Sequence, residues 1–516
     1  MYKIKSIVLL LFVVLLAGCG KPKEETNPVL SEPVITSMED EPVISYEVPE
    51  SVPGILVNQL GYITDSTKVV IFRGEELPSY FHVVNAETGV TEFAGFTEDE
   101  EYNAKTKEYN SYGDFSQFQK PGTYYIEAPY IGRSYSFVIE DDLYDDVFVE
   151  AFKQYYYNRC GMTLTEEYAG GRAHNACHTA KAVLREDISV SLDVSGGWHQ
   201  DQKGSKDVAL AAKNIGIMLL AYELYADSFT DNMGIPESNN GIPDILDEVR
   251  YEIEWLMKMQ DTSTGGIYAG VTVYDQTPGK GTNAYVEPIQ AEASRAFAMV
   301  LSKFSYLYQY YDTEYATACL KAADRAWKYA ELTDKEGADT WKFAAAAELY
   351  RASGLIGCHK VVTDYLQTGA YKEEMDEITF LGCVTYVSTK QAVNTQLCSE
   401  VMKVLMNKAE EVSLRARKSV YGTEGNDVQD NNALLLQNMM YLTMVDHVIT
   451  NHEYETLIEN HLHYFMGRNA KAISYIDNVG ERNYKEIDEN LGIMKQFDAD
   501  SKLIFMLSEI VGCHRR

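Results

Sequence analysis

Alternating hydrophobic and polar positions mark the chain after residue 53, where short β-rich stretches are separated by Gly-containing turns. Alternation of this kind is typical of strands that bury one face and leave the other in water. About seven strands within residues 54–141 predict a small β-sandwich. The clearest stretches are Ile55–Val57, Lys68–Phe72, Phe81–Val84 and Tyr124–Ile126.

From residue 142 to the C-terminus the apolar residues instead recur every three to four positions, which is the period of an α-helix. Roughly a dozen helices without a strand-rich region predict an all-α domain over residues 142–516. About twelve helices in two concentric rings would fit, although spacing alone does not separate such a barrel from other helical arrays. The expected helices lie at Val208–Tyr225, Ile245–Met259 and Ala291–Tyr308, and near 144–158, 313–331, 341–353, 391–412, 431–448, 453–466 and 500–511.

The N-terminus has the features of an export signal. Lys3 and Lys5 precede an apolar run, Ile7–Leu16, which is too short for a comfortable membrane span. The run ends in Leu-Ala-Gly-Cys19, which resembles a bacterial lipobox and implies cleavage before Cys19 and lipidation of its thiol. We therefore expect a lipoprotein signal peptide over 1–19 and a disordered, acidic and Pro-rich tether over 20–53. The folded part would be anchored by lipid at the extracytoplasmic face of a bacterial cell membrane.

Charge and cysteine content narrow the class of protein further. The net charge is −32, from 77 acidic and 45 basic residues. This excess repels phosphate backbones, and no Lys/Arg-rich stretch relieves it, so we expect no nucleic-acid partner. Of the 8 cysteines, the seven other than Cys19 are scattered and odd in number, which does not indicate a disulfide framework.

Four residues that bind soft metal ions fall in one stretch: Cys160, Cys177, His178 and His199. Two thiolates and two imidazoles are the ligands that tetrahedral zinc prefers. The spacing is not that of a zinc finger. On the pattern alone, two buried cysteines and two unrelated histidines therefore remain the competing interpretation.

The stretch Asp193–Lys206 is a loop with a Gly-Gly pair that runs into a predicted helix. With several other motifs it makes the chain resemble glycoside hydrolase family 9, the cellulase and endoglucanase family. The similarity is to the subgroup with an immunoglobulin-like domain before an (α/α)6 barrel. The motifs that carry it, in chain order, are Ile55–Tyr62, Arg159–Met162, Ala173–His178, Asp193–His199, Asn240–Glu248, Ala346–Tyr350 and Gly467–Asn469.

The resemblance implies an N-terminal immunoglobulin-like β-sandwich followed by an all-α (α/α)6 barrel. It also implies that Cys160, Cys177, His178 and His199 bind a structural zinc that fixes the loop carrying Trp198. Some relatives also bind calcium, and the resemblance leaves a calcium site in this chain open. The implied ligand is a β-1,4-glucan or a related oligosaccharide.

The reactive residues of the family are replaced in this chain. Hydrolysis of a glycosidic bond needs one carboxyl group to activate water and another to protonate the leaving oxygen. In family members two aspartates activate water and a glutamate protonates the leaving oxygen. The two aspartates align with Gln200 and Lys203, and the glutamate aligns with Met494. The sugar-gripping His-X-Arg loop that should follow Asn469 is missing. If the chain is active, Asp201 and Glu486 are the carboxylates that could have taken over.

Three functions follow from these departures. The first is a non-catalytic, cell-surface glycan-binding or scaffolding protein in which Trp198, Tyr268 and Tyr421 stack on sugar, with packing roles for these residues as the alternative. The second is an active inverting endo-β-1,4-glucanase that uses Asp201 and Glu486. The third is a protein-interaction scaffold that has lost sugar binding as well.

Overall fold

The computed structural model describes residues 53–516 except 105, 276–282, 335–339, 425–431, 450, 515 and 516. The predicted signal peptide, the lipidation site Cys19 and nearly all of the tether lie outside the described residues. Within the described part of the chain, no helix combines the length and the apolar composition needed to cross a membrane.

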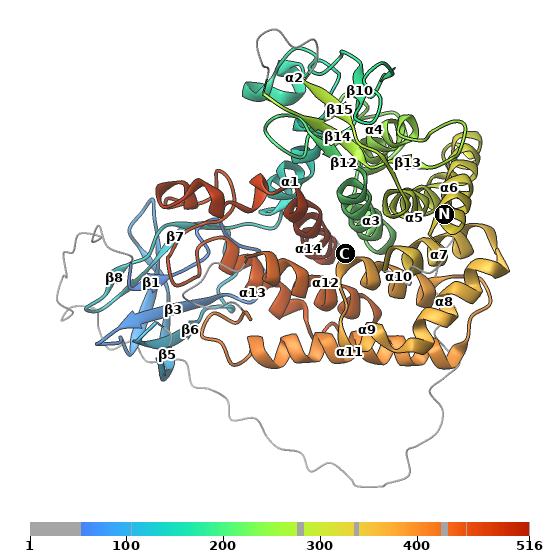
Figure 1. Ribbon diagram of the computed structural model, residues 1–516. Helices are drawn as coiled ribbons and strands as arrows, with labels where there is room; N and C mark the ends of the chain where they lie inside the picture. Colours follow the sequence, from blue (N-terminus) through green and yellow to red (C-terminus); the bar gives the residue numbers. More distant parts are fainter. Residues whose placement is uncertain are drawn as a thin grey trace, which may run out of the picture. The chain divides into compact units, whose positions relative to one another are not determined.

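Nine strands form the N-terminal β-rich domain, drawn in blue and cyan in Figure 1. They follow the order β1-β3-β6-β5-β4-β7-β9-β2, with β8 beside β7. The long strand β5 pairs with β4 through its first half and with β6 through its second half, so it joins two sheets. The strands are β1 (Ile55–Leu56), β2 (Gly61–Tyr62), β3 (Val69–Gly74), β4 (Tyr80–Asn85), β5 (Thr91–Asn103), β6 (Glu108–Asp114), β7 (Gly122–Ala128), β8 (Gly132–Arg133) and β9 (Phe137–Ile139).

Strand β7 shows why this part of the chain folds as a sandwich. Tyr124, Ile126 and Ala128 are buried, whereas Tyr125 and Glu127 between them are only partly buried. The buried set joins one apolar core with side chains from both sheets. The predicted alternation is therefore confirmed, and the two-residue strands β2 and β8 explain why the sequence indicated fewer strands.

Helices dominate the chain after α1. The described residues contain twelve helices of eleven residues or more and two short ones, α2 and α9. Figure 1 shows them from cyan through green and yellow to red. Their bounds are α1 (Asp145–Tyr157), α2 (Glu166–Ala169), α3 (Val208–Leu224), α4 (Asp244–Lys258), α5 (Ala291–Tyr308), α6 (Thr313–Thr333), α7 (Thr340–Ser353), α8 (Ile356–Thr368), α9 (Ala370–Glu373), α10 (Glu377–Ser388), α11 (Thr395–Ala416), α12 (Asn432–Val448), α13 (Glu455–Phe465) and α14 (Phe497–His514).

The long helices form an inner and an outer ring. Helices α3, α5, α7 and α10 pack in succession, and α12 packs on α14, which packs on α3. These inner helices are buried on nearly all sides, as in α10, where every residue from Ile378 to Tyr386 is buried. The outer helices bury one face only, as in α11, where Leu397, Val401, Leu405 and Ala409 recur every four positions. The fold is the (α/α)6 barrel that the sequence predicted.

Two features of the barrel domain differ from the sequence expectation. Helices α8 and α10 were not predicted, because α10 is apolar on all sides and has no helical period to detect. The expectation of no strand-rich region was wrong, since a five-stranded sheet in the order β11-β10-β15-β14-β12 and a β13–β16 pair lie among the helices. These strands are too short to show alternation: β10 (Ala182–Leu184), β11 (Ser191–Leu192), β12 (Lys206–Asp207), β13 (Ile267–Tyr268), β14 (Gly270–Val273), β15 (Ala284–Val286) and β16 (Ile289–Gln290).

The turn before β2 holds the segment that follows α13. The Gln59 backbone N–H donates to the Met466 carbonyl at 2.8 Å, and its side-chain amide donates to the Ala472 carbonyl at 2.8 Å. The same amide accepts from the backbone N–H of Arg482 at 3.0 Å. Three hydrogen bonds from one residue therefore fix residues 466–482, which include a wall of the pocket described below.

Candidate metal centre and adjoining pocket

The structure brings together all four of the predicted metal ligands. The ligand atoms of Cys160, Cys177, His178 and His199 lie within 4.8 Å of one another. Cys160 follows the end of α1, Cys177 and His178 lie between α2 and β10, and His199 lies just before β12. Three loops separated along the sequence therefore converge on one point.

Backbone hydrogen bonds hold two of these loops side by side. The Cys160 N–H donates to the Gly197 carbonyl at 2.7 Å, and the His199 N–H donates to the Asn158 carbonyl at 2.7 Å. Gly204 has a left-handed φ of +87°, and a Cβ there would lie 2.5 Å from the His178 ring. A side chain at residue 204 would therefore displace a ligand.

The two cysteines and a buried lysine form the electrostatic core of the cluster. A hydrogen bond between the two thiols lowers the pKa of Cys177, and the same contact together with burial raises the pKa of Cys160. The Lys206 ammonium lies 3.8 Å from the Cys160 Sγ and donates to the carbonyls of Val194 and Gly196 at 2.9 and 2.7 Å. The lysine thus ties the Gly-Gly turn to the metal-binding loop and favours a thiolate beside it.

The geometry of the cluster suits a tetrahedral metal ion. Bonds of about 2.0–2.3 Å place tetrahedral ligand atoms roughly 3.3–3.8 Å apart. The Cys177 Sγ and the His199 Nε2 are 3.4 Å apart. Two thiols and two imidazoles are the donor set that zinc-like ions prefer. The four residues could therefore hold a metal ion with small side-chain adjustments.

Trp198 is a packing residue in this structure. Its side chain is fully buried and its indole N–H donates to the Glu248 carboxylate at 2.8 Å. The same carboxylate pairs with the buried Arg159 guanidinium at 3.0 Å. The expected stacking of Trp198 on sugar is therefore replaced by a role in the core.

The structure also changes the roles expected for the other two predicted stacking residues, Tyr421 and Tyr268. Tyr421 is fully buried and contacts Tyr464, so its ring offers no face to a ligand. Tyr268 is partly buried in the β13–β16 pair and does not line the pocket described next. Both expectations rested on residue type, and aromatic residues are as suited to a core as to a sugar surface.

A pocket of about 480 Å³ lies directly beside the metal cluster. Gln200 and Met494, which sequence alignment placed at the base and acid positions, both line it although they are far apart in sequence. Lys203 is not part of the lining, because its ammonium turns away to pair with Asp275 at 2.9 Å. The lining residues are Gln154, Asn158, Arg172, His199, Gln200, Asp201, Gln202, Asp477, Met494, Phe497 and Asp500.

The Gln200 side chain is occupied by the backbone at the start of α3. Its amide donates to the Asp207 carbonyl at 2.9 Å and accepts from the Asp207 N–H at 2.6 Å. Asp207 in turn caps α3 by accepting from the Leu210 N–H at 2.8 Å. Gln200 therefore does structural work that a carboxylate could do only in part, since a carboxylate cannot donate.

The two carboxylates proposed to replace the missing ones occupy different places. Asp201 lines the pocket, and backbone N–H groups of Ser205 and Lys203 donate to it at 2.9 and 2.8 Å. Burial would raise the pKa of Asp201, but these hydrogen bonds outweigh it and lower the pKa. Glu486 is 55% exposed, lies near Arg482 and does not line the pocket, so it is poorly placed as an acid.

Two pocket carboxylates were missed from the sequence. Asp477 accepts hydrogen bonds from the Tyr484 hydroxyl and the Lys485 ammonium, the latter at 2.9 Å. Asp500, in the first turn of α14, is 2% exposed, and its Oδ1 has no hydrogen-bond partner among the described residues. An Asp-Ala-Asp sequence at a helix start reads as ordinary N-terminal charge, so no sequence signal distinguished Asp500.

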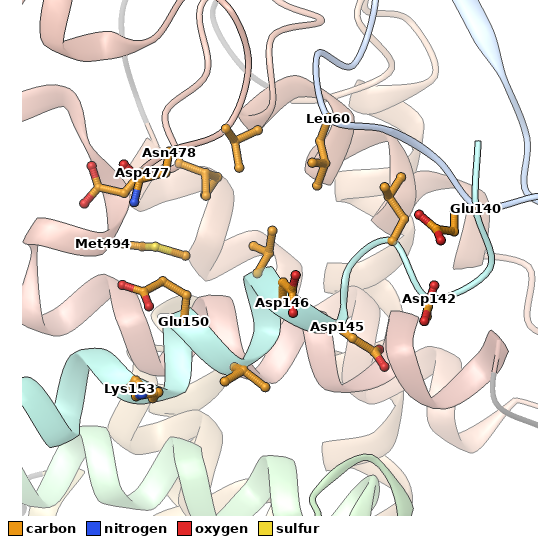
Figure 2. Close-up of a pocket in the computed structure, with 15 residues that line it drawn as sticks. Leu60, Glu140, Asp142, Asp145, Asp146, Glu150, Lys153, Asp477, Asn478 and Met494 are labelled. Carbon is orange, nitrogen blue, oxygen red and sulfur yellow. The ribbon is translucent and has the colours of Figure 1, made fainter. Parts of the chain in front are cut away.

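A second pocket, of about 670 Å³, adjoins the first at Asp477 and Met494. Figure 2 shows Met494, Asp477 and Glu150 at one end and Glu140 and Asp142 at the other. Asp145 and Asp146, in the first turn of α1, also line it, and Lys153 is the basic residue of the lining. The two pockets together form an acidic recess that begins at the metal-binding loop.

Comparison with known proteins identifies the family. The sequence pattern described as "Glycosyl hydrolase family 9" matches residues 144–498, and that of a "Cellulase N-terminal ig-like domain" matches residues 50–133. The chain belongs to glycosyl hydrolase family 9. The resemblance inferred from the motifs is thereby confirmed for both domains of this family 9 protein.

Relatives of this family 9 protein include named glucanases. It is 26% identical to endoglucanase D of Acetivibrio thermocellus over 462 residues, which cover 83% of this chain and 73% of the relative. It is also 26% identical to a xyloglucan-specific endo-beta-1,4-glucanase of Bacteroides ovatus, covering 84% of this chain and 81% of that protein.

Solved structures confirm the fold of the family 9 protein. A metagenome-derived family 9 endoglucanase has a TM-score of 0.79 at 23% identity, covering 89% of this chain and 98% of that chain. A structure described as a Zn-binding triple mutant of the family 9 endoglucanase J30 has a TM-score of 0.74 at 20% identity, covering 86% and 99%. At these identities the likeness shows the architecture alone.

Proposed function

We propose that this family 9 protein binds a β-1,4-glucan chain or a related oligosaccharide at its pocket without cleaving it. The observation that carries the proposal is the pair Gln200 and Met494, which meet in the pocket where a base and an acid would be needed. Polar amides and carboxylates beside Met494 and Phe497 suit a sugar, which has hydroxyl edges and apolar faces. A solved family 9 neighbour is described as a complex with cellobiose-like isofagomine, which supports the ligand class.

The chemistry of the two replaced positions supports binding without hydrolysis. The Gln200 amide is not a base, and both of its polar atoms are already used by Asp207. A Met494 thioether has no proton to give to a leaving oxygen. Each missing carboxylate removes a factor of about 10²–10⁴ attributable to acid–base catalysis, so losing both leaves little of the family's activity.

Calorimetry with cellotetraose and cellohexaose, combined with a reducing-sugar assay on soluble β-glucans, tests the proposal. We expect saturable binding and no release of reducing ends above a buffer control. Failure to bind any of several glucans would favour a protein-interaction role. Sustained release of reducing ends would establish an enzyme.

Weak hydrolysis through relocated carboxylates is the second candidate, and the pocket provides one observation in its favour. Asp201 has a lowered pKa and Asp500 a raised one, and both line the pocket. Carboxyl groups whose pKa values are pushed apart are the usual sign of an acid and base pair. Reducing ends that are released by the wild type and lost in Asp201→Asn would establish this function and exclude the first.

We also propose that the ion held by Cys160, Cys177, His178 and His199 is a structural zinc. With all four ligands supplied by the protein, the ion would have no open position for substrate, which is typical of a structural site. Metal analysis of the purified protein should find about one zinc per chain. Protein that is metal-free as purified and unaffected by added zinc would contradict this assignment.

We further propose that Cys19 is lipidated and anchors the protein at the extracytoplasmic face of a bacterial cell membrane. The proposal rests on the short apolar run before Leu16-Ala17-Gly18-Cys19. Expression in a bacterium with labelled palmitate should give labelled protein in the membrane fraction, and Cys19→Ala should lose the label. Equal labelling of the variant would contradict lipidation at this cysteine.

A further inference from the structure

Asp500 is a buried pocket residue with a hydrogen-bonding atom that no other described residue uses. Its side chain is 2% exposed and lines the cavity from the first turn of α14. Its Oδ1 is buried and has no hydrogen-bond partner among the described residues. A buried polar atom without a partner is costly, so such an atom beside a cavity indicates that a ligand or an ordered water completes its bonding.

The charged groups around Asp500 disfavour its ionised form. Burial raises the pKa of its carboxyl group well above the usual range, and the negative charges of Asp477 and Glu150 act in the same direction. Arg172 opposes them, but it is shared with Gln154 at 2.9 Å and with Glu150 at 3.3 Å. The remaining titratable groups that face it or line the same pocket are Tyr155 of α1, and His199 and Asp201 of the metal-binding loop.

The other polar groups of the pocket show which ligand would suit Asp500. Asp477 is held by Tyr484 and Lys485, and no lysine lines the cavity. An anionic sugar such as a uronate would meet acidic groups with one shared arginine to offset them. A neutral sugar oxygen can accept a hydrogen bond from a carboxylic acid without bringing charge into the pocket.

We propose that Asp500 is a recognition residue of the pocket, whose carboxylic acid donates a hydrogen bond to a neutral oxygen atom of the bound sugar. The inference rests on the proposed sugar binding and holds whether or not the sugar is cleaved. The family resemblance does not imply this role for Asp500. Sugar binding must weaken as the pH rises and Asp500 loses its proton.

Two substitutions of Asp500 separate donation from simple space filling. Asp500→Asn keeps a donor of the same shape that does not ionise, whereas Asp500→Leu keeps the volume and removes the donor. Asp364→Asn is the matched control, because Asp364 lies on the exposed surface of α8 and pairs with Lys360. Calorimetry with cellotetraose at several pH values between 5 and 9 measures the effect, and thermal unfolding confirms that each variant is folded.

We expect cellotetraose to bind the wild type and Asp364→Asn with an affinity that falls as the pH rises. Asp500→Asn should bind with a pH-independent affinity near the acidic wild-type value, and Asp500→Leu should bind about fivefold to tenfold more weakly, which is the loss of one hydrogen bond. An Asp500→Asn profile that still falls with pH, or an Asp500→Leu affinity equal to that of the wild type at acidic pH, overturns the role of Asp500 alone. A wild-type protein that binds no glucan at any pH overturns this inference together with the proposed function.

Discussion

The metal cluster and the proposed sugar pocket are neighbours on one loop, and His199 belongs to both, as a ligand of the cluster and as part of the pocket lining. On one side, His199, Cys160, Cys177 and His178 form a complete ligand set. On the other side, Gln200 has no base function and is bound to the backbone of Asp207. Under the proposed function, the family frame is kept at His199 and the family chemistry is lost at the next residue.

Under the proposed function, the loop keeps its shape without the carboxylates that the reaction would need. The features that shape the loop are the proposed metal ion, the Lys206 hydrogen bonds to two carbonyls and the buried Trp198. None of them depends on the carboxylates that would act on a substrate. Fold and chemistry are separable properties, so the shape of the loop does not require the reaction.

Removing one ligand of the metal cluster should give the largest effect on stability. Cys177→Ser weakens metal binding, and the binding energy of a structural ion is folding energy. We expect the variant to unfold at a temperature lower by about 5 °C, on the scale of several kcal/mol for a domain of this size. Differential scanning fluorimetry with and without a strong chelator measures the change.

Cys398→Ser is the matched control for the metal cluster, since Cys398 is also partly buried but lies on α11. It should unfold close to wild type. Chelator should destabilise the wild type and leave Cys177→Ser unchanged. If chelator has no effect on the wild type, the frame does not depend on a metal, and the contrast between the two regions loses its physical cause.

Truncation of Trp198 should give the next largest effect. The indole is fully buried and bonded to Glu248, so Trp198→Ala leaves a cavity and removes one partner of a buried carboxylate. We expect a loss of about 3–5 kcal/mol in the free energy of unfolding, measured by urea denaturation. Trp341→Ala, at a partly buried position of α7, should cost clearly less. Similar losses in the two variants would contradict a core role for Trp198.

Sequence patterns predicted the architecture better than the details of the pocket. Helix α5 was predicted at its observed bounds, Ala291–Tyr308, because apolar residues that recur every three to four positions are a local signal. The ligand cysteines and histidines were found because few residue types bind soft metals. Asp500 could not be found, since its burial and its missing partner depend on α1 and the segment after α13, which are distant in sequence.

The predicted stacking residues show that residue type alone does not predict burial. Trp198 and Tyr421 have side chains that suit a sugar surface, but the packing of the barrel places both in the core. Residue type predicted the role of Cys177, because few residue types bind soft metals. It did not predict the role of Trp198 or Tyr421, because an aromatic side chain suits both a core and a sugar surface. Burial is a property of the whole fold, so it was available only from the structure.

Returning a carboxylate to the base position should have a moderate effect on stability and none on activity. The Gln200→Asp side chain is one methylene shorter and has no amide donor, so it cannot reproduce both hydrogen bonds to Asp207, which should cost about 1–2 kcal/mol. No hydrolysis of β-glucan should appear, because Met494 still provides no acid. Gln202→Asp, an exposed position lining the same pocket, is the control and should leave stability unchanged. Measurable reducing-sugar release from Gln200→Asp alone would mean that another group already acts as the acid.

Substitution of Lys203 should give the smallest effect, and it tests where the pocket ends along the loop. The alignment places Lys203 at a water-activating position, but its side chain is exposed and pairs with Asp275 outside the pocket lining. Ion pairs between exposed side chains contribute little, since water and salt screen them. Lys203→Ala should therefore bind cellotetraose with wild-type affinity and unfold at the wild-type temperature. A several-fold change in affinity would place Lys203 in the binding site and extend the pocket lining by one residue beyond Gln202.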